Sequence, residues 1–207
     1  LKNFENILTL DDEKLRKANI VDDFFSKNRP EYVFLIGGKS GGIKANQEMP
    51  ASLMIDNLKI ISNTISTSHK FGVKKLLFLG SSCSYPKYCK QPMKIDMLMS
   101  GILEPTNSSY GMSKLTGLEL CSAYRKEFND NFISAIPANI FGPEDDFSSD
   151  NSHVIAALMK KIFKALKENH DTVKVWGSGK PKREFIYVDD LSEAIIFLMK
   201  NYNGPAP

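Results

Sequence analysis

Residues 74–80 read KKLLFLG, a short apolar run that stops at a glycine. A run of this length between turn residues is typical of a strand with both faces buried, as in a parallel sheet. Two other runs have the same character: Tyr32–Ile36, which also stops at a glycine, and Phe132–Ile136. The sequence therefore predicts three parallel strands.

Segments with apolar residues at helical spacing alternate with these strands. The predicted helices run from Asp11 or Asp12 to about Lys27, from Ala51 to about Phe71, from Ser108 to Phe128, from about His153 to Glu168, and from Asp189 or Asp190 to Lys200. Short strands are also expected at Val173–Trp176 and Phe185–Val188. Regular alternation of strands and helices indicates an α/β fold with a doubly wound parallel sheet.

The apolar positions of the first three helices define the faces that we expect to be buried. They are Leu15, Ile20, Phe24 and Phe25 in the first, Leu53, Ile55, Leu58, Ile61 and Ile65 in the second, and Leu115, Leu118, Cys121, Tyr124 and Phe128 in the third. Ser108 or Ser109 is expected to cap the third helix.

The composition is that of an ordinary globular protein. Of the 207 residues 42% are hydrophobic and 25% are charged, which suits one large or two small domains. The net charge of +3 gives no reason to expect a nucleic-acid or membrane partner. Three cysteines without paired or metal-ligand spacing, no leader and no apolar run near ~18 residues lead us to expect a cytoplasmic protein with free thiols and no metal.

Tyr110 and Lys114 lie near the start of the third helix. Four residues apart, they share one face of the helix, one turn from each other. A nearby ammonium favours the phenolate, so we expect Tyr110 to exchange a proton near neutral pH and to serve as a general acid or base. The alternative is that Tyr110 packs its ring while Lys114 is solvated.

Several polar or glycine-rich segments border the predicted strands. They are Gly37–Gly42, Ser81–Cys83, Pro137–Ile140 and the segment before Arg183. Ligands of open parallel sheets bind beyond the carboxyl ends of the strands, so we expect a site there. The GGKSGG segment itself matches neither the G-x-G-x-x-G nor the Walker pattern, and a flexible turn explains it equally well.

Several longer motifs narrow this prediction. They are KSGGIKAN (39–46), LLFLGSSCSYPK (76–87), QPM (91–93), LEPTNSSYGMSK (103–114), NSHVIAALMKK (151–161) and VWGSGKPKREFIYVDD (175–190). With them the chain resembles, over nearly its whole length, the extended short-chain dehydrogenase/reductases, and among these the GDP-L-fucose synthases, which are GDP-4-keto-6-deoxymannose 3,5-epimerase/4-reductases. The resemblance implies a Rossmann-like fold.

The resemblance also implies catalytic roles. Tyr110 would protonate the C4 oxygen of the sugar, Lys114 would activate Tyr110 and contact the cofactor ribose, and Ser81 would donate a hydrogen bond to the same oxygen. Cys83 and His153 would move protons at the carbons that flank the ketone. Read from the residues alone, the favoured interpretation is that Cys83 is a small buried hydrophobe and His153 a residue at a helix start.

The same resemblance implies the ligands and their contacts. NADPH would be lined by Leu79, Gly80, Ser81, Ser82, Lys114, Pro137, Ala138, Asn139, Ile140 and His153. The GDP-sugar would be held by Lys161, Trp176 and Arg183, although most of the family has arginine in place of Lys161, which permits bidentate phosphate contact. Two subunits would pair through the helices 51–71 and 108–128.

The family's first strand and its G-x-x-G-x-x-G turn are not found in these 207 residues. We therefore expect a fragment or a truncated homologue, with an incomplete dinucleotide-binding domain at 1–145 and part of a substrate-binding region at 146–207. Two alternatives stay open: another nucleotide-sugar epimerase or dehydratase of the superfamily, and a non-catalytic nucleotide-sugar binding module.

Overall fold

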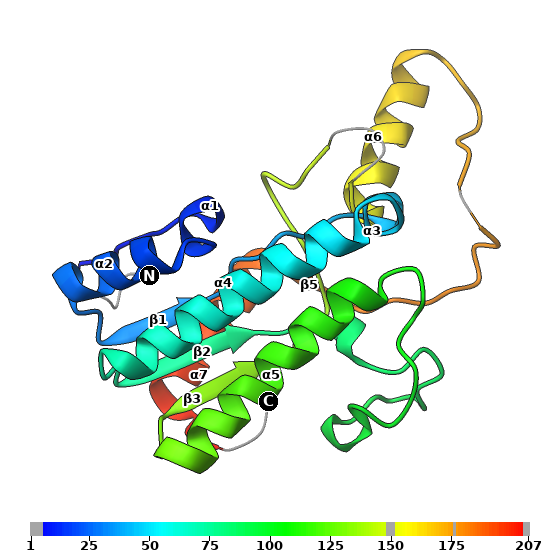
Figure 1. Cartoon of the computed structure of the whole chain (residues 1–207). Helices are drawn as coiled ribbons and strands as arrows, with labels where there is room; N and C mark the ends of the chain where they lie inside the picture. Colours follow the sequence, from blue (N-terminus) through cyan, green and yellow to red (C-terminus); the bar gives the residue numbers. More distant parts are fainter. Residues whose placement is uncertain (1–5, 148–151, 176, 205–207) are drawn as a thin grey trace.

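The computed structural model describes residues 6–147, 152–175 and 177–204, and its centre is a three-stranded sheet (Figure 1). The strand order is β1 (Tyr32–Leu35), β2 (Lys75–Leu79) and β3 (Phe132–Ala135), and both neighbouring pairs are parallel. A second parallel pair joins β4 (Asn139–Phe141) to β5 (Phe185–Tyr187). The predicted α/β class is confirmed.

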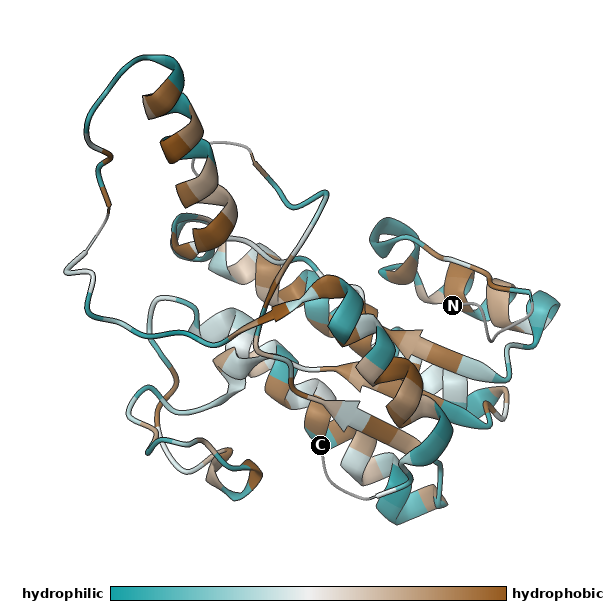
Figure 2. Cartoon of the chain, turned by 180° about the vertical axis from the view of Figure 1, so that it is seen from behind, coloured by the Kyte–Doolittle hydropathy of each residue, from teal (hydrophilic) through white to brown (hydrophobic). Residues whose placement is uncertain are grey.

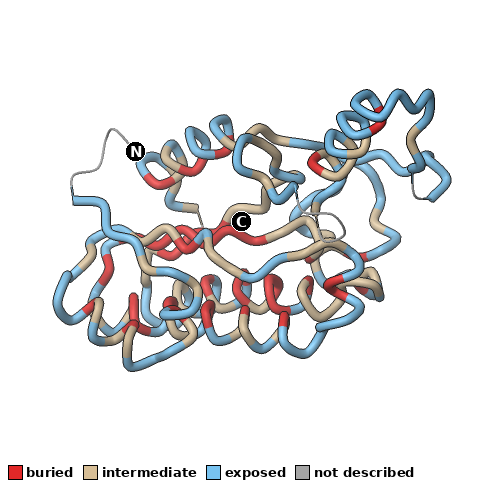
Figure 3. The backbone as a smooth tube through the Cα atoms, turned by 90° about the horizontal axis from the view of Figure 1, so that it is seen from above, coloured by how far each residue is buried: buried red, intermediate tan, exposed pale blue. Residues whose placement is uncertain are grey.

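Helices cover both faces of the three-stranded sheet (Figure 3). One face carries α1 (Asp12–Leu15), α2 (Ala18–Asn28), α4 (Pro50–Lys70) and α5 (Ser108–Phe128), and the other carries α7 (Val188–Asn201). The remaining helices are α3 (Ile43–Glu48), α6 (Val154–Lys167) and two short 3₁₀ turns, η1 (Ser82–Ser84) and η2 (Ile95–Met97). Helix α7 packs against the three-stranded sheet although it follows residue 145 in the chain. The expected division of the chain into two regions near residue 145 stays a prediction.

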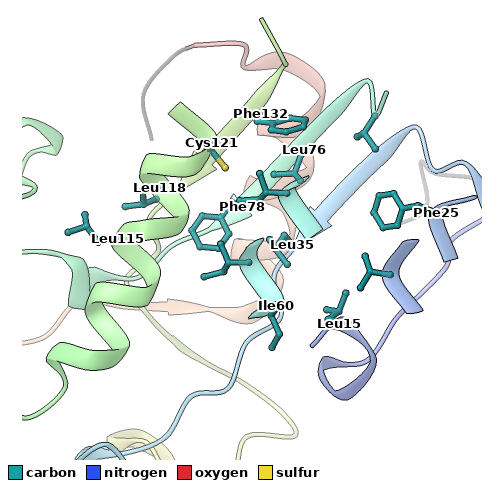
Figure 4. Close-up of a cluster of buried hydrophobic side chains, with 14 residues drawn as sticks. Leu15, Phe25, Leu35, Ile60, Leu76, Phe78, Leu115, Leu118, Cys121 and Phe132 are labelled. Atoms are coloured by element: carbon teal, nitrogen blue, oxygen red, sulfur yellow. The ribbon is translucent and has the colours of Figure 1, made fainter. Parts of the chain in front are cut away.

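Strand β2 supplies side chains to two separate cores. Leu76 and Phe78 lie in the cluster formed with α4 and α5, whereas Leu77 and Leu79 lie in the cluster formed with α7. This follows from the alternation of side chains along a strand. Figure 4 shows Phe78 between the strands and Leu118 of α5. Complete burial of a side chain of this size contributes roughly 2–3 kcal/mol, so β2 is central to the stability of both layers.

Gly117 lets α5 approach β2 closely. A Cβ atom at this position would lie 2.4 Å from Cζ of Phe78, whose ring is fully buried. Any larger residue would force the ring or the helix to move. This close approach sets the first turn of α5 beside the carboxyl end of β2.

Some expected helices and strands were misplaced. The first helix divides into α1 and α2 because Lys17 adopts an extended backbone. Residues 43–48 form α3, for which no helix was predicted, and β4 forms in the segment after Pro137, where no strand was predicted. Residues 173–175 form no strand. Asn107, not Ser108 or Ser109, is the N-cap residue of α5.

The buried stripe of α4 also differs from the predicted face. Ile55 is 50% exposed, whereas Asn57, Ile60 and Thr64 are buried. Polar side chains can be buried in this stripe because they hydrogen-bond to the helix backbone, as Thr64 Oγ1 does to the Ile60 carbonyl at 2.8 Å. In α5, Leu115, Leu118 and Cys121 are buried as predicted, but Phe128 is 46% exposed.

Lys75 fastens α7 to the amino end of β2. Its side chain is only 4% exposed, and its Nζ donates to the carbonyls of Leu198 (3.0 Å), Met199 (2.7 Å) and Tyr202 (2.6 Å). The carbonyls of Met199 and Tyr202 lie at the end of α7, where a helix leaves its last carbonyls without backbone donors, whereas the Leu198 carbonyl also accepts from the Tyr202 amide at 3.0 Å. Burial, with the nearby positive charge of Arg125, lowers the pKa of Lys75. Arg125 itself donates to the carbonyl of Asn203 at 2.8 Å.

We expect Lys75→Met to destabilise the protein by about 1–3 kcal/mol, because it leaves buried carbonyls without a donor. Urea denaturation measures the change. The neighbouring Lys74 is a matched control, since its side chain is 61% exposed and pairs with Glu31 at the surface. Lys74→Met should change the stability little, and equal effects of the two substitutions would show that the contact with α7 contributes nothing.

Candidate active site

The carboxyl ends of β1, β2 and β3 lie at one edge of the sheet, where the first turn of α5 meets η1. Gly111 makes this contact possible, because a Cβ atom there would lie 2.4 Å from the carbonyl oxygen of Cys83. The backbone of Cys83 therefore rests directly on the helix that carries Tyr110. The segment that follows β2 therefore meets the helix that carries Tyr110 and Lys114.

Tyr110 is half-buried, and Ser81, which follows β2, is one of the groups that affect its pKa. Burial, and next the charge of Cys83, raise the pKa of Tyr110 to about 12, while the Ser81 side chain opposes this shift. The sequence prediction of a phenol that exchanges its proton near neutral pH was therefore wrong. A phenol with this raised pKa stays protonated at neutral pH, which suits a proton donor.

Lys114 lies beneath the end of β2. Its side chain is 4% exposed, and Nζ donates to the Leu79 carbonyl at 3.0 Å and lies 5.1 Å from the centre of the Phe78 ring. Burial lowers the pKa of Lys114 to about 8, and the carboxylate of Asp12 opposes this shift. The alternative of a solvated lysine is therefore excluded.

Asp12 and Asn57 lie near Lys114, and the sequence analysis did not single out either as a site residue. Asp12 Oδ2 accepts a hydrogen bond from the amide of Gly38 at 3.3 Å. Gly38 has φ +143°, and a Cβ atom there would lie 2.7 Å from Asn57 Oδ1 and 3.4 Å from Lys114 Nζ. A glycine at this position therefore keeps the surroundings of the ammonium uncrowded.

Asn57 is 1% exposed, and its Nδ2 donates to the carbonyls of Lys39 and Leu53, both at 2.8 Å. Its Oδ1 is buried and has no hydrogen-bond partner among the described residues. A buried acceptor without a partner is costly, so the place beside Gly38 and Lys114 is suited to a polar ligand group. The sequence carried one signal of this, a polar residue one turn after Leu53 on a buried helical face.

Cys83 completes the cluster. It is a free, half-buried cysteine whose Sγ accepts a hydrogen bond from Asn107 Nδ2 at 3.2 Å. Its backbone amide donates to Ser81 Oγ, also at 3.2 Å. The structure thus brings four predicted site residues together: Ser81, Cys83, Tyr110 and Lys114.

The predicted substrate residues and His153 are not part of this cluster. His153 is the exposed N-cap residue of α6, and within the described ranges its side chain has no hydrogen bond to Cys83 or Tyr110. Lys161 donates to the Lys174 carbonyl at 3.1 Å, and Arg183 donates to the Lys182 carbonyl at 2.7 Å. Trp176 lies outside the described residues. Figures 1 and 2 show α6 projecting away from the sheet, with apolar residues along its length.

The predicted cofactor segments follow β2 and β3 at the same edge. Leu79 and Gly80 are buried, and Ser82, Pro137 and Ala138 are half-buried. Asn139 and Ile140 are exposed residues of β4, and Asn139 Nδ2 donates to the Glu184 carbonyl at 3.0 Å. These residues, with Lys114, line the strand ends where a dinucleotide binds in open parallel sheets.

The described residues hold no group of three or more His, Cys, Asp or Glu side chains arranged for a metal ion. Among the same residues no helix has both the length and the apolar character needed to cross a membrane.

A parallel sheet with a serine, a tyrosine and a lysine near its strand ends is a Rossmann-like arrangement, and open parallel sheets of this class bind nucleotides beyond their strand ends. Comparison with known proteins makes this specific. The sequence matches the NAD dependent epimerase/dehydratase family over residues 2–207, and the chain belongs to that family.

Individual relatives are similar over nearly the whole chain. A GDP-L-fucose synthase from Sinorhizobium fredii is 44% identical over 95% of the chain and 63% of its own length. The chain therefore spans less than two thirds of that relative. A GDP-L-fucose synthetase from Naegleria fowleri, solved with NADP bound, is 32% identical, with a TM-score of 0.86 over 97% of this chain and 66% of its own. A GDP-mannoheptose C4 reductase from Campylobacter jejuni with NADP bound is 31% identical, with a TM-score of 0.85 over 97% and 68%.

The lowered pKa of Lys114 makes stability depend on pH. Below about pH 8 the folded protein carries the full cost of a buried ammonium. As the pH rises from about 8 towards 10.5, the folded protein releases this proton before the unfolded protein does, so the cost disappears. Relative to a Lys114→Met variant, the wild type should gain roughly 3 kcal/mol over this range. Urea denaturation of both proteins from pH 7 to pH 10.5 measures the difference, and a constant difference would contradict it.

Proposed function

We propose that the protein to which this chain belongs is an NADPH-dependent epimerase/reductase that converts GDP-4-keto-6-deoxy-D-mannose to GDP-L-fucose. The observation that carries the proposal is the position of Cys83, whose backbone amide donates to Ser81 Oγ and whose charge raises the pKa of Tyr110. A simple ketone reductase needs a proton donor and a hydride, whereas epimerisation also needs a group that exchanges protons with carbon. The similarity to GDP-L-fucose synthases supports the same substrate.

Ser81 and Tyr110 are suited to act on the C4 ketone oxygen. Removing a proton from C3 or C5 places negative charge on that oxygen, and hydrogen-bond donors aimed at it stabilise the enolate. Tyr110 keeps its proton at neutral pH because its pKa is raised to about 12. It therefore donates a hydrogen bond during enolisation and can give up the proton when C4 is reduced.

Cys83 and His153 are the proposed proton-transfer pair. Epimerisation requires one group to remove a proton from carbon and another to return it on the opposite face. Thiols and imidazoles titrate close to neutral pH, so both residue types suit this exchange. In the structure only Cys83 lies at the cluster, so the proposal requires the start of α6 to approach it when substrate is bound.

The proposed cofactor is NADPH, which supplies the hydride for C4 when bound. Asn57 Oδ1, to which no described residue donates, and the uncrowded Lys114 ammonium fit the hydroxyl and amide groups of a dinucleotide. The NADP-bound structures of the two similar proteins support NADP over NAD. Lys161, Trp176 and Arg183 are the proposed contacts of the GDP-sugar.

A second candidate is a GDP-sugar 4-reductase without epimerase activity. The separation of His153 from the Cys83 and Tyr110 cluster favours it, as does the similarity to a GDP-mannoheptose C4 reductase. Such an enzyme would use Ser81, Tyr110 and Lys114 alone. Exchange of substrate hydrogen with solvent distinguishes the two candidates.

The test uses protein expressed from its complete coding sequence, with GDP-4-keto-6-deoxy-D-mannose in D₂O. The proposal expects deuterium at C3 and C5 before NADPH is oxidised. Cys83→Ser should slow this incorporation ~10²–10⁴-fold. The same variant should still catalyse the NADPH-dependent reduction of an already epimerised 4-keto sugar at nearly the wild-type rate. Cys89→Ser is the matched control and should leave both rates unchanged. NADPH oxidation without deuterium incorporation would favour the 4-reductase.

We also infer a homodimer that acts in the cytoplasm. Helices α4 and α5 lie side by side, and Ile55 and Met112 on them are 50% and 44% exposed. The three thiols are unpaired, as in proteins of reducing compartments. Light scattering should give a mass of about two chains, and Ile55→Lys with Met112→Lys should halve it. A wild-type mass of one chain at micromolar concentration would disprove this pairing.

A further inference from the structure

Asn107 occupies the N-cap position of α5 but does not cap the helix with its side chain. Asparagine is among the preferred N-cap residues because its Oδ1 usually accepts a bond from an amide of the first turn. Here its backbone carbonyl still accepts the first helical bond, from Gly111 N at 2.9 Å. The side chain is turned elsewhere, so it gives up the stabilising bond of an N-cap residue.

The side chain of Asn107 is directed at the Cys83 sulfur. Its Nδ2 donates to Sγ at 3.2 Å, while its Oδ1 is buried and has no hydrogen-bond partner among the described residues. An amide that leaves its own oxygen unpaired in order to donate to a sulfur is in a costly arrangement. Costly local arrangements of this kind gather at functional sites.

The donated bond affects the chemistry of the sulfur. A sulfur atom accepts hydrogen bonds much more strongly as thiolate than as thiol, so a fixed donor favours the thiolate. On the same segment, Ser81 Oγ accepts a bond from the Cys83 backbone amide at 3.2 Å, and an ionised Tyr110 would repel the thiolate. Among the described residues, the side-chain amide of Asn107 donates a hydrogen bond to this sulfur.

We propose that Asn107 is a positioning residue that fixes the Cys83 sulfur and stabilises its thiolate for proton exchange with the substrate. The proposal rests on the proposed function for the task of the sulfur. The bond between Asn107 and Cys83, and its effect on the thiolate, do not depend on any substrate.

Alkylation of the cysteines tests the effect without substrate. Two variants remove the donor and keep a favourable N-cap residue: Asn107→Ser, whose side chain is too short to reach the sulfur, and Asn107→Asp, which keeps the shape and offers only acceptors. Iodoacetamide reacts with thiolates, and peptide mass spectrometry gives the rate at each cysteine. At pH 7.5 we expect alkylation of Cys83 to slow about 3–10-fold in Asn107→Ser and further in Asn107→Asp.

Cys89 and Cys121 are internal controls for the fold. Cys121 is only 1% exposed, so loosening of α5 would speed its alkylation. The proposal expects both control rates to stay at their wild-type values. An unchanged rate at Cys83, or a faster one together with faster alkylation of Cys121, would show that Asn107 has only a structural role.

Deuterium incorporation then tests the task of the sulfur. Both variants should lower the kcat for exchange at C3 and C5 while leaving the KM for the GDP-sugar unchanged. A raised KM with unchanged kcat would overturn the positioning role. If Cys83 alkylation slows but wild-type protein exchanges no deuterium, the proposed function fails and the contact between Asn107 and Cys83 stands.

Discussion

The close packing of α5 on β2 determines where every group of the site lies. Gly117 allows the helix to rest on the Phe78 ring, and one turn earlier Lys114 donates to the carbonyl of Leu79. A further turn earlier, Gly111 has no side chain, so the backbone of Cys83 packs directly against the helix. These contacts leave the helix little freedom to slide along the strand. Tyr110, Ser81 and Cys83 are held together because the helix and the strand end are held together.

Burial in this contact also sets the electrostatics of the site. The same removal from water raises the pKa of Tyr110 to about 12 and lowers that of Lys114 to about 8. Both shifts disfavour the charged form, since desolvation penalises every charged form, although Lys114 with a pKa of about 8 is still mainly an ammonium at neutral pH. Asp12, which opposes the shift of Lys114, is therefore as much a part of the electrostatics as the predicted pair.

The strands and the two long helices could be predicted because their apolar patterns are local properties of the sequence. The break at Lys17, the short helix α3 and the strand β4 could not, because neighbouring segments decide them. The clustering of Ser81, Cys83, Tyr110 and Lys114 followed from the strand-end rule. The shift of Tyr110 was predicted in the wrong direction because burial cannot be read from a four-residue spacing. The roles of Asn57 and Asn107 depend on contacts across the fold, for which the sequence has little signal.

The contacts that hold the last helix to the sheet lie near the amino ends of the strands, whereas the candidate site lies at their carboxyl ends. Lys75 and Arg125 tie the last helix and the following turn to the strands near their amino ends, and His69 pairs there with Asp130 at 2.7 Å. The other edge is built from glycines and half-buried polar side chains. We therefore expect transient opening to begin at the carboxyl ends of the strands rather than at their amino ends. Substitutions at the carboxyl ends of the strands can therefore change ligand specificity without removing the contacts that hold the last helix to the sheet.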